Sequence, residues 1–169
     1  MLFRSVKNDL RDATDLADLL RMGRLPEAWI APPATRELRE LVRHRAKLVG
    51  LRSHCKADVH AVLAKCGIQV VMVDLFGVAG TELLDGLDLP APYAARICSL
   101  RRLLEGIDFE IGLFTGLVRC HLARDPGYTA VQTIPGIGPI LAAVLVAEIG
   151  DITRFARPSR SAARPGRTG

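Results

Sequence analysis

The chain has 169 residues, of which 49% are hydrophobic and 5% aromatic, and its formal net charge is +5. This length suits one domain or two small ones and suffices to bury a core. The scarcity of aromatic residues favours packed helices over a sandwich or barrel, so we expect an all-α fold. The charge is compatible with nucleic-acid binding without requiring it. The longest apolar run, Ile137–Ile149, is too short to span a membrane, and the charged opening residues lack a signal peptide's apolar region, so we expect a cytoplasmic protein.

The cysteines and histidines predict neither disulfides nor a zinc site. No two cysteines form a CxxC pair, and disulfides are unusual in a cytosolic helical protein. The spacing of the histidines and cysteines matches no zinc pattern, because structural sites show two close pairs. We therefore expect the cysteines to be buried thiols and the histidines to be surface or half-buried residues. The residues concerned are His44, His54, Cys55, His60, Cys66, Cys98 and Cys120.

The first expected helix covers residues 8–22, with Asn8 as its N-cap. Asp9 and Asp12 lie in its first turn, three positions apart, so both carboxylates share one face. Carboxylate oxygens are the ligands that Mg²⁺ prefers, and these two are our candidate metal-binding and catalytic residues. The alternative is purely structural, because the helix dipole alone favours acids in a first turn.

A proline-rich connector leads to the longest expected helix, residues 34–66. Its seam residues alternate spacings of three and four, which indicates a coiled-coil-like packing face. Two of them, Arg45 and Arg52, need acidic partners, an open seam or nucleic-acid phosphates. The alternative is a solvated coiled-coil surface covered by long basic side chains. The seam consists of Leu38, Leu41, Arg45, Leu48, Arg52, Cys55, Val59, Val62 and Cys66.

A short apolar stretch, Ile68–Leu75, follows Gly67, and an extended conformation is one option for it. Residues 91–123 form the second long helix, which Asp125-Pro-Gly ends. We expect the two long helices to pack antiparallel, with a short helical run near residues 128–133 after them.

The most informative stretch is IPGIGPILAAVLVAEIG, residues 134–150. Two glycines around one apolar residue allow a sharp turn and a close approach to a partner, and the next amides open a helix that favours an anion. This is the pattern of a helix-hairpin-helix that holds phosphates, with Thr133, Gly136, Ile137 and Gly138 as candidate DNA-binding residues. The alternative is an ordinary helical corner in which the glycines only allow tight packing.

Together these motifs resemble the insertion-sequence "one-ten" family of transposases, which includes the Piv-type DNA invertases. The resemblance covers about residues 6–157 and rests on the Asp-x-x-Asp-Ala helix entry, the arginine-rich helix at a fixed distance, and the hairpin followed by AEIGD-x-x-RF. It implies a DNA recombinase with a RuvC-like domain, four acidic residues in the order Asp, Glu, Asp, Asp that bind Mg²⁺, a coiled-coil insertion, and a carboxyl-terminal domain with a nucleophilic serine. A guide RNA directs the choice of DNA in characterised members.

Carried over by resemblance, Asp9 and Asp12 match the third and fourth acids of an otherwise incomplete set. The implied organisation is an end of the RuvC-like domain (1–25), a helical coiled-coil region (26–125), the helix-hairpin-helix start of the carboxyl-terminal domain (126–157) and a disordered tail (158–169), for which a frameshift is one explanation. The family's first Asp and its Glu lie in a strand region for which this chain has no counterpart. Ser159 and Ser161 in the tail are not assigned the serine's role. We therefore expect an inactive fragment that binds no Mg²⁺ stably.

Three functions follow as alternatives. The first is a fragment of a DNA-binding transposase, with DNA and a guide RNA as partners. The second is a non-enzymatic helix-hairpin-helix module that binds nucleic acid. The third is an oligomerisation fragment whose 34–66 helix pairs with itself or with full-length transposase and interferes with its assembly. None of the three involves a membrane.

Overall fold

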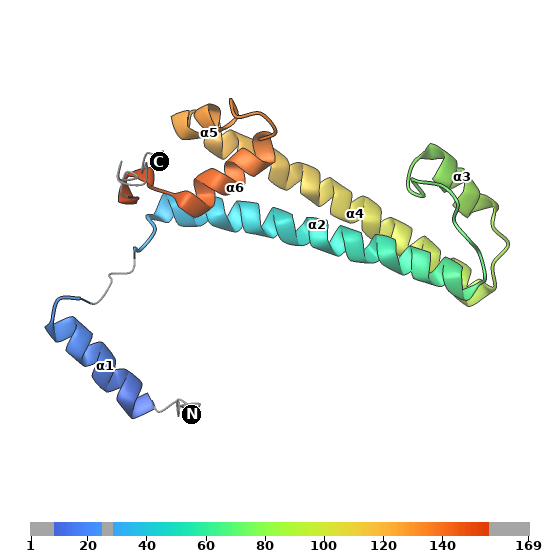
Figure 1. The fold of residues 1–169 in the computed structure, drawn as a ribbon. Helices are drawn as coiled ribbons and strands as arrows, with labels where there is room; N and C mark the ends of the chain where they lie inside the picture. Colours follow the sequence, from blue (N-terminus) through green and yellow to red (C-terminus); the bar gives the residue numbers. More distant parts are fainter. Residues whose placement is uncertain (1–8, 25–28, 156–169) are drawn as a thin grey trace, which may run out of the picture. The chain divides into compact units, whose positions relative to one another are not determined.

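The computed structural model describes residues 9–24 and 29–155, and the chain divides into two compact units, residues 1–31 and 32–169. Each unit is considered separately. All regular elements in the described ranges are helices, which confirms the all-α prediction (Figure 1). None of these helices is both long and apolar enough to cross a bilayer. The predicted tail at 158–169, with Ser159 and Ser161, and the predicted N-cap Asn8 lie outside the described residues.

In the described part of the first unit, the regular element is an amphipathic helix, α1 (Asp9–Arg21). Near its end, Arg21 pairs with Asp18 at 3.3 Å. The chain then leaves the helix at Gly23, whose φ of +63° is a conformation that glycine adopts without strain. The helix predicted over 8–22 is therefore confirmed within one residue at each end.

Two long helices, α2 (Pro33–Lys65) and α4 (Ala91–Leu122), form the frame of the second unit. Each has a proline in its first turn, where the missing amide costs nothing. Their antiparallel packing follows from the ion pairs between them: Arg52 pairs with Asp108, while Asp58, further along α2, pairs with Arg96, earlier in α4. Both predicted long helices are confirmed, and Figure 1 shows them lying side by side.

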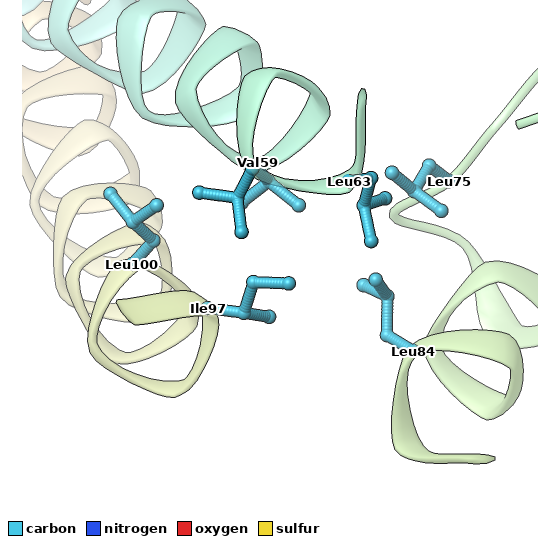
Figure 2. Packing of buried hydrophobic residues seen from close by; sticks show 7 residues of the cluster. Val59, Leu63, Leu75, Leu84, Ile97 and Leu100 are labelled. Carbon is cyan, nitrogen blue, oxygen red and sulfur yellow. The ribbon is translucent and has the colours of Figure 1, made fainter. Parts of the chain in front are cut away.

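A small head, which we define as residues 67–90, closes the end where α2 finishes and α4 begins. It contains α3 (Val78–Gly86), which the sequence reasoning missed. The preceding stretch, Ile68–Leu75, has neither helix nor strand. Buried side chains from both long helices meet the head in one core, shown in Figure 2. That core consists of Val59, Val62, Leu63, Leu75, Leu84, Ile97 and Leu100.

At the other end of the pair, α5 (Pro126–Val131) and α6 (Pro139–Ile149) follow α4, and a 3₁₀ turn (Ile152–Arg154) comes last. The carboxylate of Asp125 caps α5 by accepting a 2.7 Å hydrogen bond from the Tyr128 amide. Small residues of α6 let its backbone approach α2 and α4 closely. This second core contains Leu38, Val42, Val118, Leu122, Ala143 and Ala147.

Two arginines of α2 hold the carboxyl end of α6. Arg39 donates to the Ala147 and Glu148 carbonyls at 2.7 and 3.0 Å, which satisfies last-turn acceptors that the helix itself leaves open. Arg43 forms a bidentate ion pair with the Glu148 carboxylate, in which Nε donates to Oε1 at 2.8 Å and Nη2 donates to Oε2 at 2.7 Å. The hydrogen bond from Arg43 holds the pKa of Glu148 below its ordinary value. The basic face of α2 is therefore partly a helix-docking surface, not only a solvated one.

The cysteines correct the expectation of buried thiols. Cys98 and Cys120 are exposed, and Cys55 and Cys66 are only partly buried. Helix α4 thus presents both of its cysteines to solvent, whereas Cys55 packs against the head core and Cys66 is the C-cap of α2.

The head depends on a glycine in α3. A side chain at Gly80 would collide with the backbone carbonyl of Leu75, whereas the space around Gly86, in the same helix, is open. We expect Gly80→Ala to lower the free energy of unfolding by about 2 kcal/mol or more, because a backbone atom cannot move aside as a side chain can. The matched variant Gly86→Ala should be neutral or slightly stabilising. Urea unfolding followed by circular dichroism compares them, and equal midpoints would contradict the close approach.

The attachment of α6 should weaken in acid. Because the folded pKa of Glu148 lies below its ordinary value of 4.5, its contribution is complete above about pH 4.5 and is lost as the pH falls through the folded value. Hydrogen exchange of the α6 amides should therefore accelerate in acid relative to that of the α4 amides. Glu148→Gln should remove this pH dependence, and an unchanged acid response in that variant would assign it to another group.

Candidate nucleic-acid interface

The turn between α5 and α6 contains four of the predicted site residues. Gly136 has a φ of +86°, which only glycine adopts readily, and Gly138 is the N-cap of α6. Between them, the Ile137 amide donates to the Ile134 carbonyl at 3.1 Å and closes the turn. Thr133 donates its hydroxyl to the Ala130 carbonyl at 2.7 Å, so it stabilises the end of α5. The structure thus brings these four residues together.

The first turn of α6 leaves main-chain donors available. The amides of Gly138, Ile140 and Leu141 find no acceptor among the described residues, as expected at a helix start. No atom lies within 4 Å of where a side chain would stand on Gly136 or Gly138, so the backbone is accessible from outside. Free amides at the positive end of a helix favour an anion such as a phosphate.

Arg45 lies in the seam between α2 and α4, and no carboxylate among the described residues pairs with it. Its Nε donates to the Thr115 hydroxyl at 2.8 Å, and that hydroxyl in turn donates to the Ile111 carbonyl at 2.6 Å. Burial, followed by the charge of Arg52, lowers the pKa of Arg45, although a guanidinium stays protonated. The seam therefore holds a positive charge that no described carboxylate neutralises by direct contact.

Arg52, one heptad further along α2, has an acidic partner, which was one of the three options that the sequence left open. Its Nη1 lies 3.0 Å from Oδ1 of Asp108, and both side chains are partly exposed. The two predicted arginines thus have different environments. Arg52 is compensated within the helix pair, and Arg45 has only a neutral acceptor.

A cation that the sequence reasoning missed is Arg119 of α4. It follows Val118, which packs in the same core as Ala143 of α6, and its own side chain is exposed with no ion pair in the described residues. Val42, in that same core, is three residues from Arg45. The signal available from the sequence was the regular seam of α4, which places Arg119 next to a core position.

Asp9 and Asp12 lie in the other unit, in the first turn of α1, and both are exposed. No group of three or more His, Cys, Asp or Glu side chains able to hold a metal occurs in the described part of the chain. Mg²⁺ bound by protein carboxylates keeps near-octahedral coordination, which two carboxylates satisfy only in part. These two residues by themselves therefore do not make up a complete Mg²⁺ site.

Both ends of the chain match models of known protein families. Residues 2–68 match a model described as a transposase. Residues 128–166 match a model described as the transposase IS116/IS110/IS902 family. The first match covers α1 and α2, and the second covers the turn between α5 and α6. No solved structure matches the chain.

Two curated relatives align with most of the chain. A Pseudomonas aeruginosa protein named as a family 20 transposase is 26% identical over 160 residues, which are 89% of this chain and 46% of the relative. A Sinorhizobium fredii protein named as transposase y4qE is 28% identical over 154 residues, which are 90% of this chain and 37% of the relative. The chain thus spans less than half the length of each relative. With both family models matching at the expected places, the chain belongs to the IS116/IS110/IS902 family of transposases.

Proposed function

We propose that this chain is a DNA-binding part of an insertion-sequence transposase and that it holds duplex DNA at the turn between α5 and α6. The observation that carries the proposal is the coincidence of free amides at Gly138, Ile140 and Leu141 with arginines of α2 and α4, Arg45 and Arg119, that have no ion pair among the described residues. Family membership adds that the larger proteins of this kind act on DNA.

The proposed contact is to the phosphate backbone. Main-chain amides at a helix start recognise phosphate oxygens and carry no base-reading side chain, so this contact positions the DNA without selecting a sequence. Arg119, next to the core residue Val118, and Arg45 supply positive charge on the two helices against which α6 packs. An RNA phosphate offers the same oxygens, so a guide RNA is a further proposed partner of this surface.

We further propose that strand cleavage needs ligands beyond Asp9 and Asp12. Two carboxylates on one helical face hold Mg²⁺ weakly and cannot organise two metal ions around a scissile phosphate. The function proposed for this chain by itself is therefore to hold DNA, and Asp9 and Asp12 would supply part of a metal site in a larger assembly.

Salt dependence tests the phosphate contact. The logarithm of the affinity for a labelled duplex should fall linearly with the logarithm of the salt concentration, because each neutralised phosphate releases counterions. Arg119→Ala should reduce the magnitude of this slope by about one unit. Arg102→Ala is the matched control, because Arg102 is also an exposed arginine of α4 without an ion pair in the described residues, but lies nearer the head. Absence of duplex binding at low salt, or equal effects of both variants, would contradict the proposed location.

The cleavage proposal makes a separate prediction. Incubated with supercoiled plasmid and Mg²⁺, the purified chain should leave the plasmid intact while still retarding it on a gel. The informative control is Asp9→Asn, which should bind DNA as the parent does. Mg²⁺-dependent nicking by the parent that disappears in Asp9→Asn would show that the chain is catalytically competent and would reject this part of the proposal.

A further inference from the structure

Helix α4 has a second, largely apolar row of residues, which we call the outer row. Its members alternate spacings of four and three, and in the helix register they lie opposite the buried row that contains Ile97, Leu104 and Ile111. Phe109 exposes 71% of its surface and Leu113 exposes 49%. Exposed apolar side chains that continue along one helix face mark a contact surface. The outer row consists of Arg102, Gly106, Phe109, Leu113, Gly116 and Cys120, with the exposed Leu103 and Leu117 along one side.

The outer row is complementary in shape to a second copy of itself. When two helices pack antiparallel with this spacing, each side chain of one row enters a hole formed by four residues of the other. Phe109 can then stand opposite Leu113 of the second copy, in a hole that includes Gly112 and Gly116 of that copy. No described atom lies within 4 Å of where a side chain would stand on either glycine. The large ring of one copy thus matches the open space of the other.

The charges beside the outer row fit the same arrangement. With Phe109 opposite Leu113 of the second copy, the flanking Glu105 comes beside Arg119 of that copy, and two-fold symmetry makes this pair twice. A parallel arrangement would instead place Glu105 beside Glu110 of the second copy, where like charges repel. In the antiparallel arrangement Glu110 faces only its own copy across the axis. Two attractive pairs then stand against one repulsive contact.

Glu105 and Arg119 are available for this pairing, because neither forms an ion pair among the described residues. The cations of the head region near Glu105 have other contacts: Arg101 pairs with Asp85, and Lys56 lies over the Phe76 ring. No acidic residue lies within four positions of Arg119 along the sequence. Arg102 is exposed at the end of the outer row, where a long basic side chain keeps its charge in water.

We propose that the outer row of α4 is a contact between two copies of this chain, which pack antiparallel about a two-fold axis level with Ile111. Burial of Phe109 and Leu113 gives the affinity, and the Glu105–Arg119 pairs set the direction. Two helices that meet over a few turns bury less than the roughly 1,600 Å² of a standard protein interface, so this dimer is weak. The proposal does not rest on the DNA contact proposed above.

Sedimentation equilibrium of the full chain, without nucleic acid and at about 10 to 500 µM, tests the contact. We expect a monomer–dimer equilibrium. Gly112→Leu fills the hole for Phe109 and should weaken the dimer about tenfold or more, although loss of an interior glycine favours the helix itself. Gly50→Leu is the matched control, because Gly50 is an interior glycine of α2 with the same open space. A monomer at every concentration, or equal effects of both variants, would overturn the proposal.

Charge reversal tests the antiparallel register. Glu105→Arg and Arg119→Glu each bring like charges together and should weaken the dimer, whereas the double variant should restore it. Glu110→Gln removes the repulsion across the axis and should strengthen the dimer. Because Glu110→Gln keeps the size of the side chain, its result stands even where circular dichroism shows that a charge reversal disturbs folding. A double variant no tighter than the single ones, or no gain from Glu110→Gln, would reject the proposed contact.

Arg119 also belongs to the proposed DNA contact, so the two proposals are measured apart. Duplex binding is measured with the chain below the concentration at which it dimerises, and Gly112→Leu should leave that binding unchanged. Dimerisation without duplex binding would reject only the proposed function. Duplex binding by a chain that stays monomeric at every concentration would reject only the contact between copies.

Discussion

The antiparallel seam between α2 and α4 supports the head through one core and α6 through another, and it contains charge. Apolar residues alone would make a tighter seam, because an arginine within it must be desolvated or paired. Arg52 reaches Asp108 at the edge, whereas Arg45 is held by the Thr115 hydroxyl, which is itself anchored to the Ile111 carbonyl. A hydroxyl satisfies one donor of a guanidinium without cancelling its charge. Placing Arg45 in the seam therefore lowers the stability of the helix pair. It also leaves a positive charge three residues from Val42, which packs in the core with α6.

The docking of α6 joins residues that are more than a hundred positions apart. Arg39 caps the carboxyl end of α6 by donating to the Ala147 carbonyl, and Arg43 donates two hydrogen bonds to the Glu148 carboxylate. Because these contacts fix one end of a short helix, they also fix the direction in which its other end, with Gly138 and the free amides, is presented. An anion-binding turn on an unanchored helix would have to be ordered when the ligand binds, at a cost in affinity.

The long helices were predictable because their seams repeat over many turns, and both were located to within one residue. The helix of the head, α3, was not predictable in this way, because it has only nine residues. Its position also depends on the close approach of Gly80 to the Leu75 backbone, which no local sequence pattern reveals. The turn residues Thr133 to Gly138 were predicted together because glycine and proline spacing is a local signal. The roles of Arg39 and Arg43 could not be read from α2 alone, since their partners are in α6. The one hint was Glu148, an isolated acid in an otherwise apolar helix. Association through the 34–66 helix stays a prediction.

The attachment of α6 has a kinetic consequence. Arg39 and Arg43 hold the carboxyl end of this helix against α2 in the free protein. An anion that reaches the amides of Gly138, Ile140 and Leu141 therefore meets a helix start that is already in place. Association through a surface of this kind does not wait for a conformational change, which would otherwise lower the association rate.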